Sequence, residues 1–132
     1  MTLSAHTFIQ QLEQRLQQSF KTEDDGIQYF TYKNHLSVGL RYTQDPYILE
    51  CFACFGDLPK DLPKDFYKQL LKAHFFGLET LNAIFALSEE DNKLYFTRTL
   101  ECNRMSEEAG ITELWRFCET FLIWKKRLLH LL

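Results

Sequence analysis

The segment from residue 57 to residue 78 constrains the fold of this chain more than any other. It repeats the four residues Asp-Leu-Pro-Lys and then continues as an apolar, helix-like run from about Leu62 to Leu78. Each proline fixes its own φ and keeps the residue before it out of the helical region, so the repeat predicts a stiff elbow. Asp61 is the expected helix cap, and Pro63 is expected in the first turn, where an N–H is not needed.

The predicted helix is apolar on two sides. A helix that lies on one sheet needs a single apolar stripe about 100° wide, so two stripes require two covers. Either the helix is buried on all sides within one chain, or a second polypeptide covers it. A chain of 132 residues with three helices rarely has enough material for complete burial, which favours a partner, most simply another copy across a twofold axis. The first stripe is Phe66, Leu70, Ala73 and Gly77, and the second is Tyr67, Leu71, His74, Phe75 and Leu78.

The remaining periodicity predicts two more helices and five strands. Apolar residues at helical spacing from Phe8 to Phe20 predict a first helix, and Ser106 is the expected cap of a last helix with apolar residues from Ile111 to Leu129. Strands are predicted over residues 27–32, 36–42, 47–55, 81–87 and 94–100. The order α-β-β-β-α-β-β-α and the short turns predict an α+β fold, with three helices on an antiparallel sheet, in a single domain over residues 1–132.

Charge and hydropathy disfavour several classes of function. The chain has 15 basic and 18 acidic residues and a net charge of −3, whereas proteins that bind nucleic acids usually carry a basic excess or stripe. No apolar run approaches the roughly 20 residues that a membrane span needs, and no signal peptide is recognisable at the start. We therefore expect a cytosolic protein that neither binds nucleic acid nor inserts into a membrane.

The four cysteines are expected to be structural. Cys51 and Cys54 have the spacing of a redox pair, but such pairs lie at helix N-termini, and this pair lies in a strand-like run. Residues three apart in a strand point to opposite faces. A zinc site would need two more ligands at a suitable spacing, and Cys102 and Cys118 do not form a second close pair. We therefore expect four buried thiols and no metal site.

No catalytic or cofactor motif is present in the sequence. It has no P-loop, dinucleotide fingerprint, metalloprotease helix or nucleophile elbow. The acids at 24–25 and 89–91 fall in predicted turns, where solvated carboxylates are expected. His74, in the second stripe, is expected to be a packed or interface residue rather than a general base. We therefore expect no enzyme activity and no cofactor, and the surplus apolar surface indicates a binding protein.

The middle segment also carries a diffuse motif: a Leu-Pro after the third strand, then a helix with paired leucines, an alanine and a small residue. Its residues are Leu62, Pro63, Leu70, Leu71, Ala73 and Gly77. Together with the order of elements, this motif resembles the class I chaperones of bacterial type III secretion, the Tir chaperone (CesT-like) family, over about residues 7–128. The chain departs from that family at His74, where asparagine is frequent, and at residues 78–80, which replace a glycine-rich connection.

The resemblance implies a homodimer in the bacterial cytoplasm that binds the N-terminal region of a secreted effector and keeps it soluble and secretion-competent. The effector would lie extended, adding strands to sheet edges and placing apolar side chains in grooves. The dimer interface is expected to contain Tyr67, Leu71, His74, Phe75, Leu78, Leu81 and Ile84. The effector grooves are expected to contain Phe8, Leu12, Leu36, Leu40 and Leu49, and for several of these a place in the core is an equally open alternative.

Two other functions stay open at this point. A regulatory protein-binding domain of the YbjN type has the same topology and would bind a folded partner. An unrecognised small-ligand-binding domain or enzyme, using His74 and nearby carboxylates, would instead need a closed apolar pocket with convergent polar groups.

Overall fold

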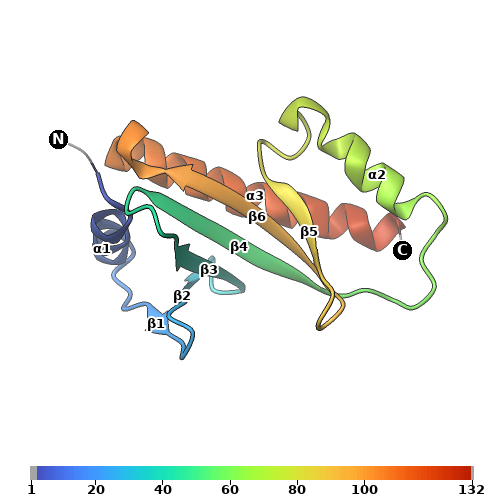
Figure 1. Ribbon diagram of the computed structural model, residues 1–132, viewed down its shortest axis with the longest axis horizontal. Helices are drawn as coiled ribbons and strands as arrows, with labels where there is room; N and C mark the ends of the chain where they lie inside the picture. The colour runs from blue at the N-terminus through green and yellow to red at the C-terminus, as the bar shows by residue number, and fades with distance from the viewer. Residues whose placement is uncertain (1–2, 132) are drawn as a thin grey trace.

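The computed structural model describes residues 3–131 and contains, within that span, three helices and one six-stranded antiparallel sheet (Figure 1). The strands are β1 (Lys21–Thr22), β2 (Gln28–Tyr32), β3 (Leu36–Tyr42), β4 (Ile48–Asp57), β5 (Ile84–Ser88) and β6 (Lys93–Glu101). The helices are α1 (Ala5–Leu16), α2 (Phe66–Ala73) and α3 (Glu107–Leu131), with 3-10 turns η1 (Phe75–Gly77) and η2 (Cys102–Arg104). The predicted α+β fold is confirmed, and the short strand β1 is an addition to it.

One face of the sheet is covered by α1 and α3, and the core lies between them and the strands. The spatial order of the strands is β1-β2-β3-β4-β6-β5, and α3 runs along β4 and β6 (Figure 1). Phe96 of β6 stacks on Phe117 of α3 with 5.5 Å between ring centroids, and Phe55 of β4 stacks on Phe121 at 4.3 Å. Because alternate side chains of a strand point to opposite faces, this leaves the other face of the sheet open.

Helix α2 lies at the edge of this core, which its Ala73 reaches, and packs mainly in a smaller cluster. Its buried residues are Phe66, Leu70 and Ala73, which belong to the first predicted stripe. Phe66 and Leu70 share an apolar cluster with Leu94 of β6 and Leu128 of α3. The sheet and α3 therefore cover only one side of α2.

Helix α2 is shorter than the predicted span 62–78. It begins at Phe66, and Pro63 lies before it, accepting a hydrogen bond from the Phe66 N–H at 3.0 Å. Asp61 is not the cap, because the extended elbow lasts one turn longer than predicted. At the other end the helix stops at Ala73, and Phe76 and Gly77 have left-handed φ values of 55° and 68°.

Two further predicted boundaries are also wrong, because residues with left-handed φ values lie at them. Helix α1 ends at Leu16 because Gln17 takes a left-handed φ of 53°, so Phe20 lies outside the helix. Strand β5 begins at Ile84 rather than at residue 81, because Leu81 and Asn82 have φ values of 49° and 71°, which no strand accommodates. The predicted cap of the last helix is confirmed, since the Ser106 hydroxyl accepts the Ala109 N–H at 3.1 Å.

Three of the cysteines are buried, and Cys54 is exposed. The prediction of four buried thiols is therefore wrong for Cys54, which lies on the opposite face of β4 from Cys51. Burial raises the pKa of Cys51 to about 12 and that of Cys102 to about 11, and it also raises the pKa of Cys118. These groups are thiols, not thiolates, at neutral pH, which argues against a redox pair at positions 51 and 54.

This difference predicts how the native protein reacts with Ellman's reagent at pH 8. Cys54 should react within minutes, whereas the raised pKa of Cys51, about 12, lowers its thiolate fraction roughly a thousandfold. The expected result is one fast thiol per chain, with the others released only on unfolding. The variant Cys54→Ser should lose the fast phase, and a fast phase that survives in it would contradict the assignment.

Candidate binding surfaces

Most of the exposed large apolar side chains gather along α2, η1 and the start of β5. Leu71, Phe75 and Leu78 are exposed by 68%, 68% and 71%, and Phe76 by 81%. We call this surface the α2–β5 patch, and its residues are Tyr67, Leu71, Phe75, Phe76, Leu78, Leu81 and Ile84. The second stripe of α2, predicted to need a cover, has none among the described residues except at His74, which packs against β5.

Hydrogen bonds attach the backbone of the α2–β5 patch to the rest of the fold. The imidazole Nε2 of His74 accepts the Phe85 N–H at 2.9 Å, and the two rings lie 5.4 Å apart. The indole N–H of Trp124 donates to the Glu79 carbonyl at 3.0 Å. One bond ties the end of α2 to β5, and the other ties the following loop to α3. The exposed side chains are therefore presented by a fixed backbone.

His74 differs from the other predicted interface residues. Its side chain is half-buried, and its Nε2 must be unprotonated to accept the Phe85 N–H. It has the surroundings of a packed residue that positions β5, and a contact across a dimer stays a prediction. Phe76, which the helical spacing did not single out, is more exposed than any predicted interface residue. Its backbone has a left-handed φ of 55°, so the helical spacing does not describe where its side chain points.

The five residues predicted to line effector grooves all lie in the core. Each is 7% exposed or less, because α1, β3 and β4 turn these side chains toward one another. They are Phe8, Leu12, Leu36, Leu40 and Leu49. The structure brings them together, but under the surface of the protomer and not on it. Their contact with an effector stays a prediction, and their burial does not support it.

The two edges of the sheet differ in what they offer to another strand. At one edge β1 has two residues, and beyond it the Gln18 side chain bonds the Thr31 backbone, donating to its carbonyl at 3.3 Å and accepting its N–H at 3.4 Å. At the other edge lies β5, whose Phe85 N–H points outward to His74. In an antiparallel ladder the backbone groups of Leu87, two residues on, point the same way. Strand β5 is thus the more accessible edge.

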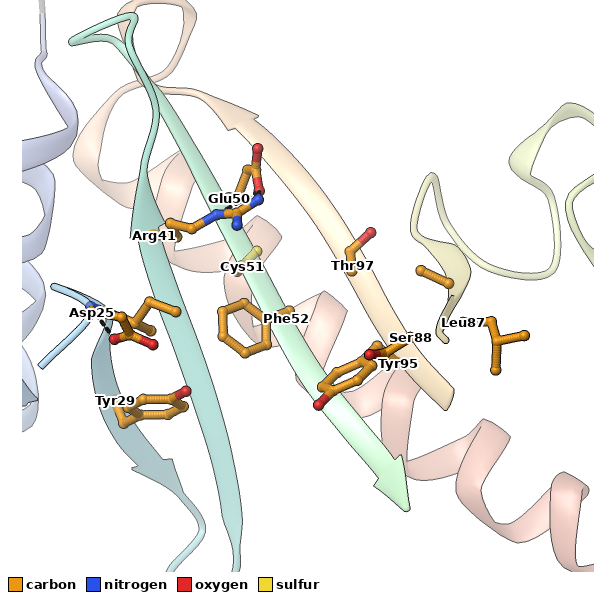
Figure 2. A pocket seen from close by; sticks show the side chains of 12 residues that line it. Asp25, Tyr29, Arg41, Glu50, Cys51, Phe52, Leu87, Ser88, Tyr95 and Thr97 are labelled. Carbon is orange, nitrogen blue, oxygen red and sulfur yellow. Dashed lines mark hydrogen bonds and ion pairs between the residues drawn. The ribbon is translucent and has the colours of Figure 1, made fainter. Parts of the chain in front are cut away.

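The open face of the sheet carries a hollow with an aromatic centre (Figure 2). Tyr29 of β2 and Tyr95 of β6 meet Phe52 of β4 edge to face, with ring centroids 6.0 and 6.2 Å apart. The hollow encloses about 580 Å³. Its lining is Asp25, Ile27, Tyr29, Arg41, Glu50, Cys51, Phe52, Ala86, Leu87, Ser88, Tyr95 and Thr97.

Two kinds of site are not found in the part of the chain that the structure describes. Within residues 3–131 no three His, Cys, Asp or Glu side chains are grouped so that they could hold a metal ion. None of the helices in that span has the length and hydropathy needed to cross a membrane.

Comparison with known proteins relates the chain to secretion chaperones. The sequence pattern of the Tir chaperone protein (CesT) family matches residues 7–122. A search of the curated proteins finds no match. Solved structures match over most of the chain, at identities that show likeness of fold alone.

Three of these structures illustrate the likeness. A chain of the ExsC–ExsE complex is 15% identical, with a TM-score of 0.70 and coverage of 96% of each chain. A chain of the heterodimeric ExoU–SpcU complex from the type III secretion system of Pseudomonas aeruginosa is 14% identical, with a TM-score of 0.69 and coverage of 89% of this chain and 92% of that one. A chain from the complex of the Yersinia pestis type III secretion chaperone SycH with a YscM2 fragment is 16% identical, with a TM-score of 0.61 and coverage of 96% and 98%.

Proposed function

The chain belongs to the Tir chaperone protein (CesT) family of type III secretion chaperones, and we propose that it acts as a homodimer that holds the N-terminal segment of an effector in extended form. The observation that carries the proposal is the α2–β5 patch, where side chains such as Phe75 and Leu78 are about two-thirds exposed or more. Contiguous apolar surface of this kind marks an interaction site.

The patch is the proposed contact between the two copies. It lies on one side of the protomer, so a twofold axis would bring the same residues of both copies together. Lys68 and Lys72 lie beside Leu71 and Phe75 on the exposed side of α2 and would form a polar rim. The residues of the interface are those predicted above, with Phe76 added to them.

The effector is proposed to bind as an added strand, with its side chains in hollows of the surface. The outward backbone groups of Leu87 in β5 offer hydrogen bonds to a further strand. An extended client loses conformational entropy on binding, so it needs a large contact area. The five buried candidates would reach an effector only if α1 separated from the sheet, and the proposal therefore places the effector on exposed residues. The proposed compartment is the bacterial cytoplasm.

Co-expression tests this function directly. The protein should form a soluble complex with about the first hundred residues of an effector encoded near its own gene, and that segment should become protected from protease. Pull-down from the native bacterium with mass spectrometry identifies the client when no neighbour is evident. A complex with a folded partner, without protection of an extended segment, would instead favour the regulatory protein-binding function.

Substitution of Phe76 by glycine provides a separate test, because it should stabilise the protomer and weaken the dimer. A left-handed φ disfavours a residue other than glycine by roughly 1–2 kcal/mol, and the φ of Phe76 is 55°. In Phe76→Gly the greater freedom of unfolded glycine offsets part of that relief, so the protomer should gain at most about 1 kcal/mol. The dimer loses one aromatic ring per copy, so its dissociation constant should rise at least about tenfold.

Denaturation and sedimentation over a range of concentrations measure the two effects of Phe76→Gly separately. The conservative variant Phe76→Leu keeps apolar surface and the strained φ, so it should move both quantities less. A dissociation constant that does not change in Phe76→Gly would remove Phe76 from the interface.

A further inference from the structure

In the hollow on the open face of the sheet, three aromatic rings form a box. The ring planes of Tyr29 and Tyr95 stand at 83° and 66° to that of Phe52. Figure 2 shows the Phe52 ring face-on between the two tyrosines. Phe52 is the floor and the tyrosines are the walls. Each of the three is only half-buried, so the box is accessible from outside.

Gly39 explains why the floor lies flat. It pairs with Phe52 across β3 and β4, and a Cβ at Gly39 would lie 2.3 Å from the Phe52 ring. At position 39 only glycine leaves room for the Phe52 ring. The ring is therefore held on the backbone of β3, with one face against the sheet and the other toward the hollow.

Acidic groups lie near both ends of the box, with Lys21 paired to Glu23 at one end and Lys93 close to Asp91 at the other. Asp25 lies at the Tyr29 end, and the negative charges of Asp25 and Glu23 add to burial in raising the pKa of Tyr29. At the other end the Tyr95 hydroxyl donates to Asp91 at 3.3 Å.

Arg41 is the one cation among the described residues that line the hollow, and its charge is already paired. Its guanidinium donates through Nε to Glu50 Oε2 at 3.1 Å and through a second nitrogen to the same oxygen. The hollow therefore combines exposed aromatic faces with the carboxylate of Asp25, for which no ion pair is found among the described residues.

We propose that this hollow is a subsite for an arginine side chain of an extended client segment. A guanidinium is planar and weakly hydrated, so it can stack on the face of Phe52 while Asp25 supplies the opposite charge. An acidic segment would be repelled by the same carboxylate. The identity of the client rests on the proposed function, but binding of arginine to the hollow is measured without it.

Two matched peptides test the proposal on the full-length protein. One is the capped pentapeptide Thr-Val-Arg-Val-Thr, and the other has citrulline in place of arginine, which keeps the shape and removes the charge. In titrations followed by ¹H–¹⁵N spectra, the arginine peptide should bind about fivefold more tightly. The amides that shift should be those of Tyr29, Phe52 and Tyr95 and of their strand neighbours.

Three variants assign the effect to the box. Phe52→Leu removes the floor, and Asp25→Asn removes the charge while its side-chain oxygen can still accept the Ile27 N–H, now at 3.0 Å. Each should bring the affinities of the two peptides to within about twofold. The control Tyr47→Leu changes an exposed aromatic residue in the turn before β4 and should keep the fivefold preference.

Equal affinities in the wild-type protein, or shifts confined to other surfaces, would overturn the proposal. So would concentration-dependent shifts of the same amides without peptide, which would show a second copy on this face. Capture of an effector segment distinguishes failure of the arginine subsite from failure of the proposed chaperone function. If the wild-type protein captures it but shows no arginine preference, the subsite is wrong and the chaperone function stands. If the preference is present and no effector is captured, the function is wrong and the subsite stands.

Discussion

If the protein forms the proposed homodimer, the variant Leu71→Asp is expected to be a monomer at concentrations where the wild-type protein pairs. Leu71 is 68% exposed in the protomer and lies at the centre of the second stripe of α2. Burying a leucine side chain contributes roughly 1.5–3 kcal/mol. A twofold interface loses this contribution twice and also has to accommodate two carboxylates. The dissociation constant should therefore rise by at least about a hundredfold.

Light scattering after size-exclusion chromatography measures the result against a protomer mass of 15.8 kDa. The matched control is Leu129→Asp, because Leu129 is also a highly exposed leucine but lies near the end of α3, outside the α2–β5 patch. The control should stay dimeric. A Leu71→Asp protein with unchanged dimer mass would show that the patch is not the contact between copies.

The variant Phe8→Ala is expected to lose about 3–5 kcal/mol of its free energy of unfolding, which is the range for a phenylalanine removed from a packed core. Phe8 is fully buried, and a Cβ at Gly110 of α3 would lie 2.6 Å from its ring. The ring thus packs directly against the backbone of α3 at Gly110. Buried residues of α1 one turn before and one turn after Phe8 hold the helix in place, so the cavity left by the ring should collapse only in part.

Chemical denaturation of this variant distinguishes a core residue from a groove residue. The comparison is Phe75→Ala, a change of the same size at a side chain that is 68% exposed. Both are best measured in the Leu71→Asp background, so that dimer dissociation does not enter the free energy of unfolding. Phe75→Ala should then change it by less than about 0.5 kcal/mol. If Phe8→Ala instead left stability unchanged and abolished effector binding, Phe8 would be a groove residue, as first predicted.

Local patterns were enough for the order of the elements, except for the two-residue strand β1. Helical spacing from Phe8 to Leu16 and the alternation around Val38 depend on residues near one another in the chain, and so does the Ser106 cap. Apart from the start of α2, which the longer elbow delays, the boundaries that failed were decided by single backbone conformations. Gln17, Phe76 and Leu81 take left-handed φ values that are unusual for their residue types, so no propensity predicts them.

The candidate sites could be predicted only where a surplus of apolar residues exceeded what one chain could cover. That argument found Leu71, Phe75 and Leu78, which are exposed as a partner surface requires. It could not separate Leu40 and Leu49 from a groove, because an apolar residue on a strand looks the same in sequence whether a helix or a client covers it.

By itself, then, the sequence determined the fold class, the family and the presence of an uncovered stripe on α2. Only the tertiary structure decided which apolar residues are core, and that Phe52 lies on Gly39 between Tyr29 and Tyr95. The physical reason is the distance along the chain over which each effect acts. Periodicity and capping act within a few residues, whereas burial and strand register depend on side chains brought together from distant parts of the chain.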